Sequence, residues 1–278
     1  MHHLRDSLAY LAFFGLLLTL PTACSETPSA PEILQQALDT NRLYGTRCQE
    51  NYEGTWIATL AGTWSTCSKF NKAMDNLAPR SFYFNLQNAE TRFEDTLDHC
   101  GGSCGGIDTV DMLFVSTHGG AWSNPARGTQ VMWNRSTRAF STNMRLGDED
   151  RGLSLYASHS CDILKNDGQL GTRWQSAFDG GLRMIVGSHD KIWFNTSYTT
   201  DGERFANNMR NGQLLKDAWK NSLAGNSADN DAAVMTTGAN DSDCWNRMDS
   251  MTWSNLLSTP RLRDWDWQTW CQLQWDNQ

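Results

Sequence analysis

"VDMLFVSTHGG" (Val110–Gly120) and "GLSLYASHSC" (Gly152–Cys161) follow the same pattern. Each is an apolar run with strand character, and each ends at a reactive side chain, His118 in the first and Cys161 in the second. A third run, "LRMIVGSHD" (Leu182–Asp190), also ends on polar residues. Strands that are apolar throughout are typical of parallel sheets, which are covered on both faces. These three stretches therefore predict a buried, largely parallel sheet.

Segments with helical spacing of their apolar residues alternate with the strand candidates. The predicted helices are 31–43, 68–78, 88–100, 169–181, 199–212 and 213–225, and the further predicted strands are 55–62, 81–86 and 232–238. The segment 121–151, rich in Trp, Asn, Arg and Ser, is predicted to be an exposed loop. This alternation predicts an α/β protein, a three-layer αβα sandwich with a mostly parallel sheet. Ligands of such sheets bind beyond the carboxyl ends of the strands, so the ends of the three quoted runs are expected to lie on one rim.

Residues 1–23 are predicted to be a signal peptide. Arg5 precedes an apolar stretch, Leu8–Leu20, that is short for a membrane span, and small residues follow it before Cys24. The sequence "LPTAC" ending at Cys24 resembles a bacterial lipoprotein signal, in which this cysteine carries the lipid; ordinary cleavage nearby, with Cys24 unmodified, is the alternative. Residues 24–35 form a polar tether, and residues 36–278 form one domain with a Trp-rich C-terminal tail. We expect an exported protein that is lipid-anchored to a bacterial membrane or cell surface, or else secreted or periplasmic.

Export changes the interpretation of the eight cysteines. If Cys24 carries lipid and Cys161 is free, six cysteines remain, which is an even number suited to disulfides in an oxidising compartment. Proximity in the sequence favours three pairs, which are Cys48–Cys67, Cys100–Cys104 and Cys244–Cys271.

The formal net charge is −8, and the sequence contains no run of lysine and arginine. An acidic chain without a basic patch repels the phosphate backbone of nucleic acids. Nucleic acid is therefore not expected as a partner.

The residues at the predicted rim suit acyl transfer. A cysteine is nucleophilic as its thiolate, so a catalytic cysteine needs a base nearby, and His118 is placed to take the proton of Cys161. Glycine has no Cβ, so Gly119 lets a substrate carbonyl approach its backbone N–H closely. This N–H and that of Cys161 are candidates for an oxyanion hole.

The order and spacing of these two blocks resemble the caspase-like cysteine peptidases, a group that includes caspases, gingipains, legumains, separases and bacterial CHAT-type domains. "STHGG" is similar to the His-Gly block and "ASHSC" to the nucleophile block, and the resemblance covers roughly Ser81 to Leu223. It implies that His118 is the base, Gly119 contributes to the oxyanion hole and Cys161 is the nucleophile. A protein or peptide substrate is implied as well. The family pattern assigns no substrate-binding residue, and the candidates near the dyad are Asp162, Asp190, His159 and His189.

Alternative interpretations of the same residues remain open. The protein is alternatively an inactive, surface-anchored binding protein on the same fold, with stacking faces for peptides or glycans offered by Trp265, Trp267, Trp270 and Trp275. No cofactor or metal is expected, although two metal sites are conceivable. A zinc site would use His118, His159, Cys161 and His189. A calcium loop, for which an ordinary polar loop is the simpler interpretation, would use Asp229, Asp231, Asp241 and Asp243.

Overall fold

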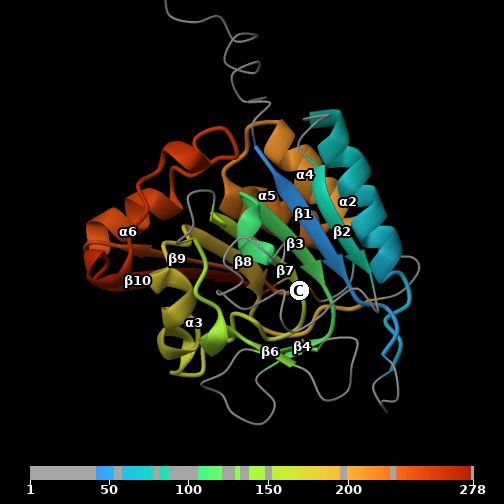
Figure 1. Cartoon of the computed structure of the whole chain (residues 1–278), viewed down its shortest axis with the longest axis horizontal. Coiled ribbons are helices and arrows are strands. Elements are labelled where there is room, and N and C mark those ends of the chain that lie inside the picture. Colours follow the sequence, from blue (N-terminus) through green and yellow to red (C-terminus); the bar gives the residue numbers. More distant parts are fainter. Residues whose placement is uncertain are drawn as a thin grey trace, which may run out of the picture.

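A sheet with seven strands among the described residues forms the centre of the protein in a computed structural model (Figure 1). The strand order is β10-β9-β8-β7-β3-β1-β2. The strands are β1 (Tyr44–Cys48), β2 (Phe82–Gln87), β3 (Met112–Ser116), β7 (Leu155–His159), β8 (Met184–Ser188), β9 (Ala232–Gly238) and β10 (Thr269–Trp275). The five strands from β2 to β8 pair in parallel, whereas β9 and β10 are antiparallel to their neighbours. The predicted α/β fold with a mostly parallel sheet is confirmed.

The structure describes residues 42–52, 58–77, 82–87, 106–120, 129–131, 138–147, 152–194, 199–225 and 230–276. The predicted signal peptide and tether, with Cys24, lie outside these residues, as do Cys100, Cys104 and Asp229. No helix within the described ranges is long and apolar enough to cross a membrane.

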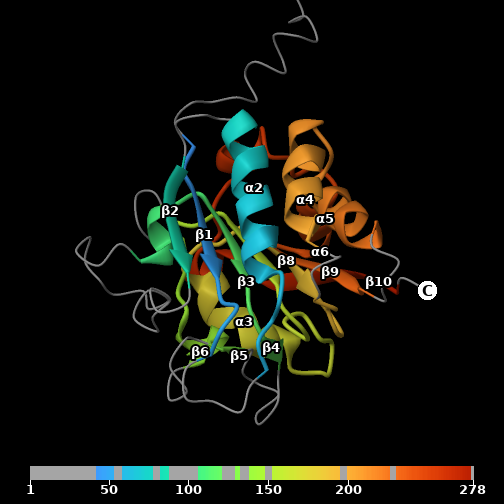
Figure 2. The same cartoon turned by 90° about the vertical axis from the view of Figure 1, so that its right-hand side faces the viewer.

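Helices cover both faces of the sheet, which gives the three layers predicted from the sequence. Figure 2 shows α2 (Thr63–Leu77), α4 (Asp201–Arg210) and α5 (Leu215–Ala224) side by side on one face. The helix α6 (Asp241–Met248) packs against β9 and β10, and its buried Met248 belongs to the core on that face. The other face is covered by α3 (Leu170–Asp179), whose Trp174 and Phe178 belong to a second core.

Buried tryptophans hold both layers of helices to the carboxyl edge of the sheet. Trp219 of α5 packs among aromatic side chains and donates its indole N–H to the carbonyl oxygen of Gly187 in β8 at 2.7 Å. On the opposite face, Trp174 of α3 donates to the carbonyl oxygen of Ile163 at 2.9 Å. A buried indole needs such an acceptor, so each tryptophan fixes one helix to a strand end or to the loop that follows it. The loops at this edge are thereby held from both sides.

The segment after β3 differs from the sequence prediction. Part of 121–151, predicted to be an exposed loop, contains β5 (Thr129–Val131) and β6 (Arg138–Phe140), which form a small antiparallel sheet with β4 (Gly119–Gly120). A short 3-10 helix, Ser141–Asn143, follows β6. Met144 and Leu146 are then buried in the core on the α3 side, because their apolar side chains fill the space beside that helix.

Two other strand predictions need correction. The described part of the predicted strand 55–62, residues 58–62, has no strand and leads into α2. Conversely, β1 and β10 were not predicted as strands. The predicted helix 88–100 and all of 31–43 except its last two residues, which are not helical, lie outside the described residues. The remaining helix and strand predictions correspond to α2, α3, α4, α5, β2 and β9, with bounds shifted by a few residues.

Within the described residues, two disulfides tie helices to the sheet. Cys48 at the end of β1 bonds to Cys67 in α2, and Cys244 in α6 bonds to Cys271 in β10. Both pairs agree with the predicted connectivity, and the third predicted pair lies outside the described residues. Cys161 is the free cysteine within the described part of the chain.

Candidate functional site

The ends of β3 and β7 bring His118 and Cys161 to neighbouring positions. These strands are parallel and in register, with Ser116, the last residue of β3, opposite His159, the last residue of β7. His118 and Cys161 each lie two residues beyond this pair, and the N–H of Thr117 donates to the carbonyl oxygen of His159 at 3.4 Å. The rim predicted from the sequence is therefore present, and both candidate catalytic residues lie on it.

Gly119 packs directly on the backbone beside the thiol. A Cβ atom at this position would lie 2.7 Å from Cβ of Ser160 and 2.8 Å from the carbonyl oxygen of Cys161. Neither neighbouring atom is the end of a flexible side chain, so no residue larger than glycine fits without moving the chain around Cys161. Glycine after His118 thus lets the start of β4 pack against the turn that carries Cys161.

The imidazole of His118 is held in one tautomer by a backbone carbonyl. Its Nε2 lies 2.9 Å from the carbonyl oxygen of Ala58, which only accepts hydrogen bonds. Nε2 therefore carries the proton, and Nδ1 keeps the lone pair that a base needs. Burial lowers the pKa of His118 below its ordinary value, so the ring is neutral at pH 7. Ala58 thus orients a neutral imidazole whose free nitrogen is Nδ1.

Tyr52 contacts both the backbone and the ring of the same histidine. Its buried hydroxyl accepts the backbone N–H of His118 at 3.1 Å, donates to the carbonyl oxygen of Gln49 at 3.0 Å, and lies 3.2 Å from Oγ1 of Thr117. The Tyr52 and His118 rings are 5.1 Å apart. Burial is the main cause that raises the pKa of Tyr52, and the nearby Cys161 adds to it, so the phenol keeps its proton. Nothing in the sequence pattern pointed to Tyr52.

The Cys161 thiol is half-buried and held by one residue of the loop that follows β8. The N–H of Ile192 donates to Sγ at 3.3 Å, and Sγ in turn lies 3.6 Å from the carbonyl oxygen of Ile192. Burial raises the pKa of the Cys161 thiol, and the charges of Asp162 and Asp190 raise it further. The resting site therefore combines a protonated thiol with a neutral imidazole, rather than a thiolate–imidazolium ion pair.

Two of the four substrate-binding candidates lie beside the thiol. Asp162 has a left-handed backbone with φ of 56°, and its N–H donates to the carbonyl oxygen of Asp190 at 2.9 Å. Burial, together with the charge of Asp190, raises the pKa of Asp162, while Lys165 at 3.7 Å lowers it. The side chain of Asp190 is exposed. The surroundings of the thiol are consequently acidic.

His159, the third candidate, is not available to a substrate. Its imidazole is fully buried, with Nε2 2.9 Å from Oδ2 of the equally buried Asp201 and Nδ1 3.4 Å from Oγ of Ser116. Its prediction as a substrate-binding residue is therefore wrong, because alternation along β7 directs this ring into the core against Phe194 and Trp219. His159 joins the end of β7 to the start of α4.

Neither of the two alternative metal sites considered from the sequence is assembled among the described residues. Within the described ranges, the one group of at least three ligating side chains whose donor atoms come within 4.8 Å of one another is His189, Asp231 and Asp276. His118, His159, Cys161 and His189 do not form such a group. The calcium loop fails because Asp231 precedes β9 whereas Asp241 follows it, at the opposite end of the strand.

A charge-removing substitution tests the electrostatics of the thiol. Asp162→Asn is expected to lower the pKa of Cys161, because it removes one of the negative charges that disfavour the thiolate. Alkylation by iodoacetamide at pH 7.5 should accelerate by about two- to fivefold, and the midpoint of the rate–pH curve should move down. Asp266→Asn, an exposed aspartate of the C-terminal segment, is the matched control and should leave the rate unchanged. A slower or unchanged Asp162→Asn reaction contradicts the assignment.

The tryptophans of the C-terminal segment are divided between packing and exposure. Trp267 donates its indole N–H to Oδ1 of Asp179 in α3 at 3.0 Å, whereas Trp265 is 91% exposed. Trp270 and Trp245 line a groove of about 390 Å³ between β10 and α6. This groove is a candidate ligand surface away from Cys161.

Comparison with solved structures finds similarity to a caspase. The crystal structure of Caspase-1 from Spodoptera frugiperda aligns over 67% of this chain and 77% of its own, with 14% sequence identity and a TM-score of 0.41. Among curated proteins, none matches the chain in sequence.

A family model described as a domain of unknown function, DUF6345, matches residues 49–275. The matched region begins one residue after β1 and ends at the last residue of β10, so it contains Tyr52, His118, Gly119 and Cys161. Because the match covers most of the sequence, the chain belongs to the DUF6345 family.

Proposed function

We propose that this protein is a cysteine peptidase that cleaves protein or peptide substrates with His118 as base and Cys161 as nucleophile. The observation that carries the proposal is the hydrogen bond between His118 Nε2 and the carbonyl oxygen of Ala58, which leaves Nδ1 unprotonated on the rim that also carries Cys161. A base oriented by a third group, next to a free thiol, is the arrangement that nucleophilic catalysis requires.

The chemistry follows from these groups. His118 Nδ1 takes the proton of the Cys161 thiol as Sγ attacks the peptide carbonyl carbon, and the carbonyl oxygen becomes an oxyanion. The backbone N–H groups of Gly119 and Cys161 are the proposed donors to this oxyanion. His118 then returns the proton to the leaving amine. Water, deprotonated by His118, hydrolyses the thioester and restores the thiol.

The charges around the thiol suggest which substrates are favoured. Asp162 and Asp190 both act electrostatically on Cys161, and Asp162 is half-buried. A cationic side chain next to the scissile bond would neutralise these carboxylates, whereas an acidic side chain would be repelled. We therefore expect preference for lysine or arginine over aspartate immediately before the cleaved bond.

Labelling with peptidyl acyloxymethyl ketones tests the proposal. The full chain is treated at pH 7 with three probes that differ only in carrying Lys, Leu or Asp beside the electrophile. We expect saturable labelling of Cys161 that is fastest with the Lys probe and disappears in Cys161→Ala. If all three probes label Cys161 at the rate of a free thiol and without saturation, the result would contradict a peptidase.

A binding protein for peptides or glycans is the second candidate, and the groove beside Trp245 and Trp270 supports it. Aromatic faces in a groove offer stacking surfaces to such ligands. In that case Trp270→Ala abolishes binding to a peptide or glycan array, while Cys161→Ala leaves binding unchanged and no hydrolysis is detected.

Export with a lipid on Cys24 remains part of the proposal. The disulfides Cys48–Cys67 and Cys244–Cys271 support an oxidising compartment, where such bonds persist. Mass spectrometry of the N-terminal peptide from the producing cell decides the point, because an unmodified Cys24 would exclude the anchor.

A further inference from the structure

Three neighbouring strands have their paired end residues in one row, and the residue next to each of these ends carries a possible metal ligand. Ser188 at the end of β8 pairs with Ala232 at the start of β9, and Ala232 also pairs with Trp275 at the end of β10. His189, Asp231 and Asp276 are each one residue beyond this row. Residues that lie opposite each other on neighbouring strands project to the same face, so the register itself brings these three side chains together.

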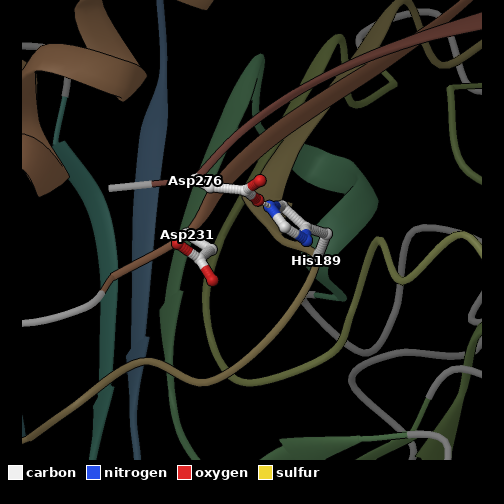
Figure 3. Close-up of side chains that lie close together, drawn as sticks. All are labelled: His189, Asp231 and Asp276. Atoms are coloured by element: carbon white, nitrogen blue, oxygen red, sulfur yellow. Dashed lines mark ion pairs between the residues drawn. The ribbon is translucent and has the colours of Figure 1, made fainter. Parts of the chain in front are cut away.

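The carboxylate of Asp276 reaches the imidazole of His189, and Asp231 lies beside this pair (Figure 3). His189 Nε2 lies 3.2 Å from Oδ1 of Asp276, and the ligand atoms of all three residues lie within 4.8 Å of one another. Donors bound tetrahedrally to zinc at about 2.0 Å are about 3.3 Å apart, so small side-chain rotations would complete such a site. His189 is half-buried and Asp231 is buried, whereas Asp276 is mostly exposed.

The charge of the cluster favours a bound cation. Asp231 and Asp276 bring two carboxylates to one place beside the imidazole of His189. The contact between His189 and Asp276 as an ordinary ion pair is the alternative to a metal site. A divalent cation would be attracted by both carboxylates and would also bind the imidazole nitrogen.

We propose that His189, Asp231 and Asp276 bind a divalent transition metal, with zinc as the best fit. An imidazole nitrogen combined with two carboxylate oxygens suits Zn²⁺ or Mn²⁺, while Ca²⁺ and Mg²⁺ prefer sites made of oxygen alone. Three protein ligands leave a fourth position for water, so the site is open rather than purely structural. The three ligands adjoin the ends of three different strands, so only the folded chain brings them together.

The site adjoins the loop that holds the thiol. His189 lies three residues before Ile192, whose backbone contacts Cys161 Sγ, and Asn230, next to Asp231, accepts the N–H of Trp193 at 2.8 Å. A metal that fixes His189 against Asp231 would restrain both ends of the segment 189–193. The proposal does not depend on peptidase activity, since it concerns binding by residues outside the dyad.

Calorimetry with Zn²⁺ tests the site. The full chain, purified in mild detergent and freed of metal by chelation, is titrated with Zn²⁺, and a parallel Co²⁺ titration records the visible spectrum. We expect one saturable site per chain and a rise in Tm on binding, because the ion binds the folded state. Asp231→Asn and Asp276→Asn should weaken binding by at least about tenfold, the effect typical of losing even a partner of a metal ligand.

Two matched variants separate this site from zinc binding elsewhere on the chain. Asp190→Asn removes an exposed carboxylate directly beside His189 and should leave zinc affinity unchanged. Cys161→Ala should also bind normally, which excludes the thiol as the ligand. Absence of saturable binding overturns the proposal and leaves His189 and Asp276 as an ion pair. Binding that survives both Asp231→Asn and Asp276→Asn, or that Cys161→Ala abolishes, overturns it equally.

Discussion

Replacing His118 with alanine is expected to slow labelling of Cys161 by the peptidyl probe about 10²- to 10⁴-fold at pH 7. Burial and the neighbouring carboxylates raise the pKa of the thiol, so very little thiolate exists at this pH without a base. His118 supplies that base through Nδ1, since Nε2 is bonded to Ala58. Stopped-flow or quenched labelling rates of both proteins measure the loss directly.

The pH profile distinguishes a lost base from a damaged fold. His118 has a lowered pKa and Cys161 a raised one, so the wild-type rate should rise from acid as His118 loses its proton and then stay level through neutral pH. In His118→Ala the rate should instead follow the thiolate fraction, increasing about tenfold per pH unit with no level region. A level region that persists in the variant, or a rate within about threefold of wild type, contradicts the role of His118.

A thiol reaction that needs no base is the control. Iodoacetamide reacts with the thiolate, so at pH 9 the His118→Ala and wild-type proteins should react at rates within about threefold of each other. Equal rates show that Cys161 is still accessible and that the chain around Gly119 is intact. The slower peptidyl labelling of His118→Ala at pH 7 is then due to the missing proton transfer from the thiol.

Much of this site followed from three apolar runs. Strands β3, β7 and β8 were predictable because they are buried on both faces and read as continuous apolar sequence, and parallel pairing puts their carboxyl ends on one edge. Gly119 was predicted for its approach to a substrate. The structure adds a stronger reason, which is its close contact with the chain of Ser160 and Cys161.

The strands missed by the sequence prediction have patterns that loops and helices share. β1 contains Gly45, Thr46 and Arg47, and a strand with a buried arginine does not look apolar. β10 mixes Trp with Gln at the edge of the sheet, where side chains are only partly covered. Burial of these segments depends on neighbours far away in the sequence, so local pattern could not reveal it.

The partners of His118 and the metal cluster were missed for a related reason. The acceptor for Nε2 is the backbone carbonyl of Ala58, and every residue has such a group, so no sequence pattern marks it. His189, Asp231 and Asp276 come together through antiparallel pairing of β8, β9 and β10. The sequence pattern grouped Asp231 with Asp241 because they are near in sequence, while strand β9 separates them.

Replacing Asp201 with alanine is expected to destabilise the protein by about 3–5 kcal/mol, which corresponds to a fall in Tm of roughly 10 °C. Asp201 and His159 are fully buried and bonded to each other at 2.9 Å, among Phe114, Phe194 and Trp219. Removing Asp201 leaves a polar imidazole in an apolar core without that partner. The free-energy cost of taking the imidazole out of water is then no longer offset by the hydrogen bond to Asp201. Denaturant unfolding of both proteins gives the difference.

Asp217→Ala is the matched control. Asp217 occupies the first turn of α5 as Asp201 does in α4, and its replacement by alanine removes the same side-chain atoms. Unlike Asp201, Asp217 is only partly buried. Its helix-terminal charge should contribute about 0.3–1 kcal/mol. If Asp201→Ala costs no more than this control, Asp201 acts only on the helix dipole and the buried pair is not a stabilising contact.

The double variant His159→Phe with Asp201→Leu separates the pair from its surroundings. Apolar side chains of similar volume need no partner, so the double variant should recover much of the stability lost in Asp201→Ala. His159 precedes Cys161 by two residues, and its ring holds the end of β7 against α4. If stability returns but peptidyl labelling does not, the pair is needed to position the thiol. If both return, its role is confined to folding.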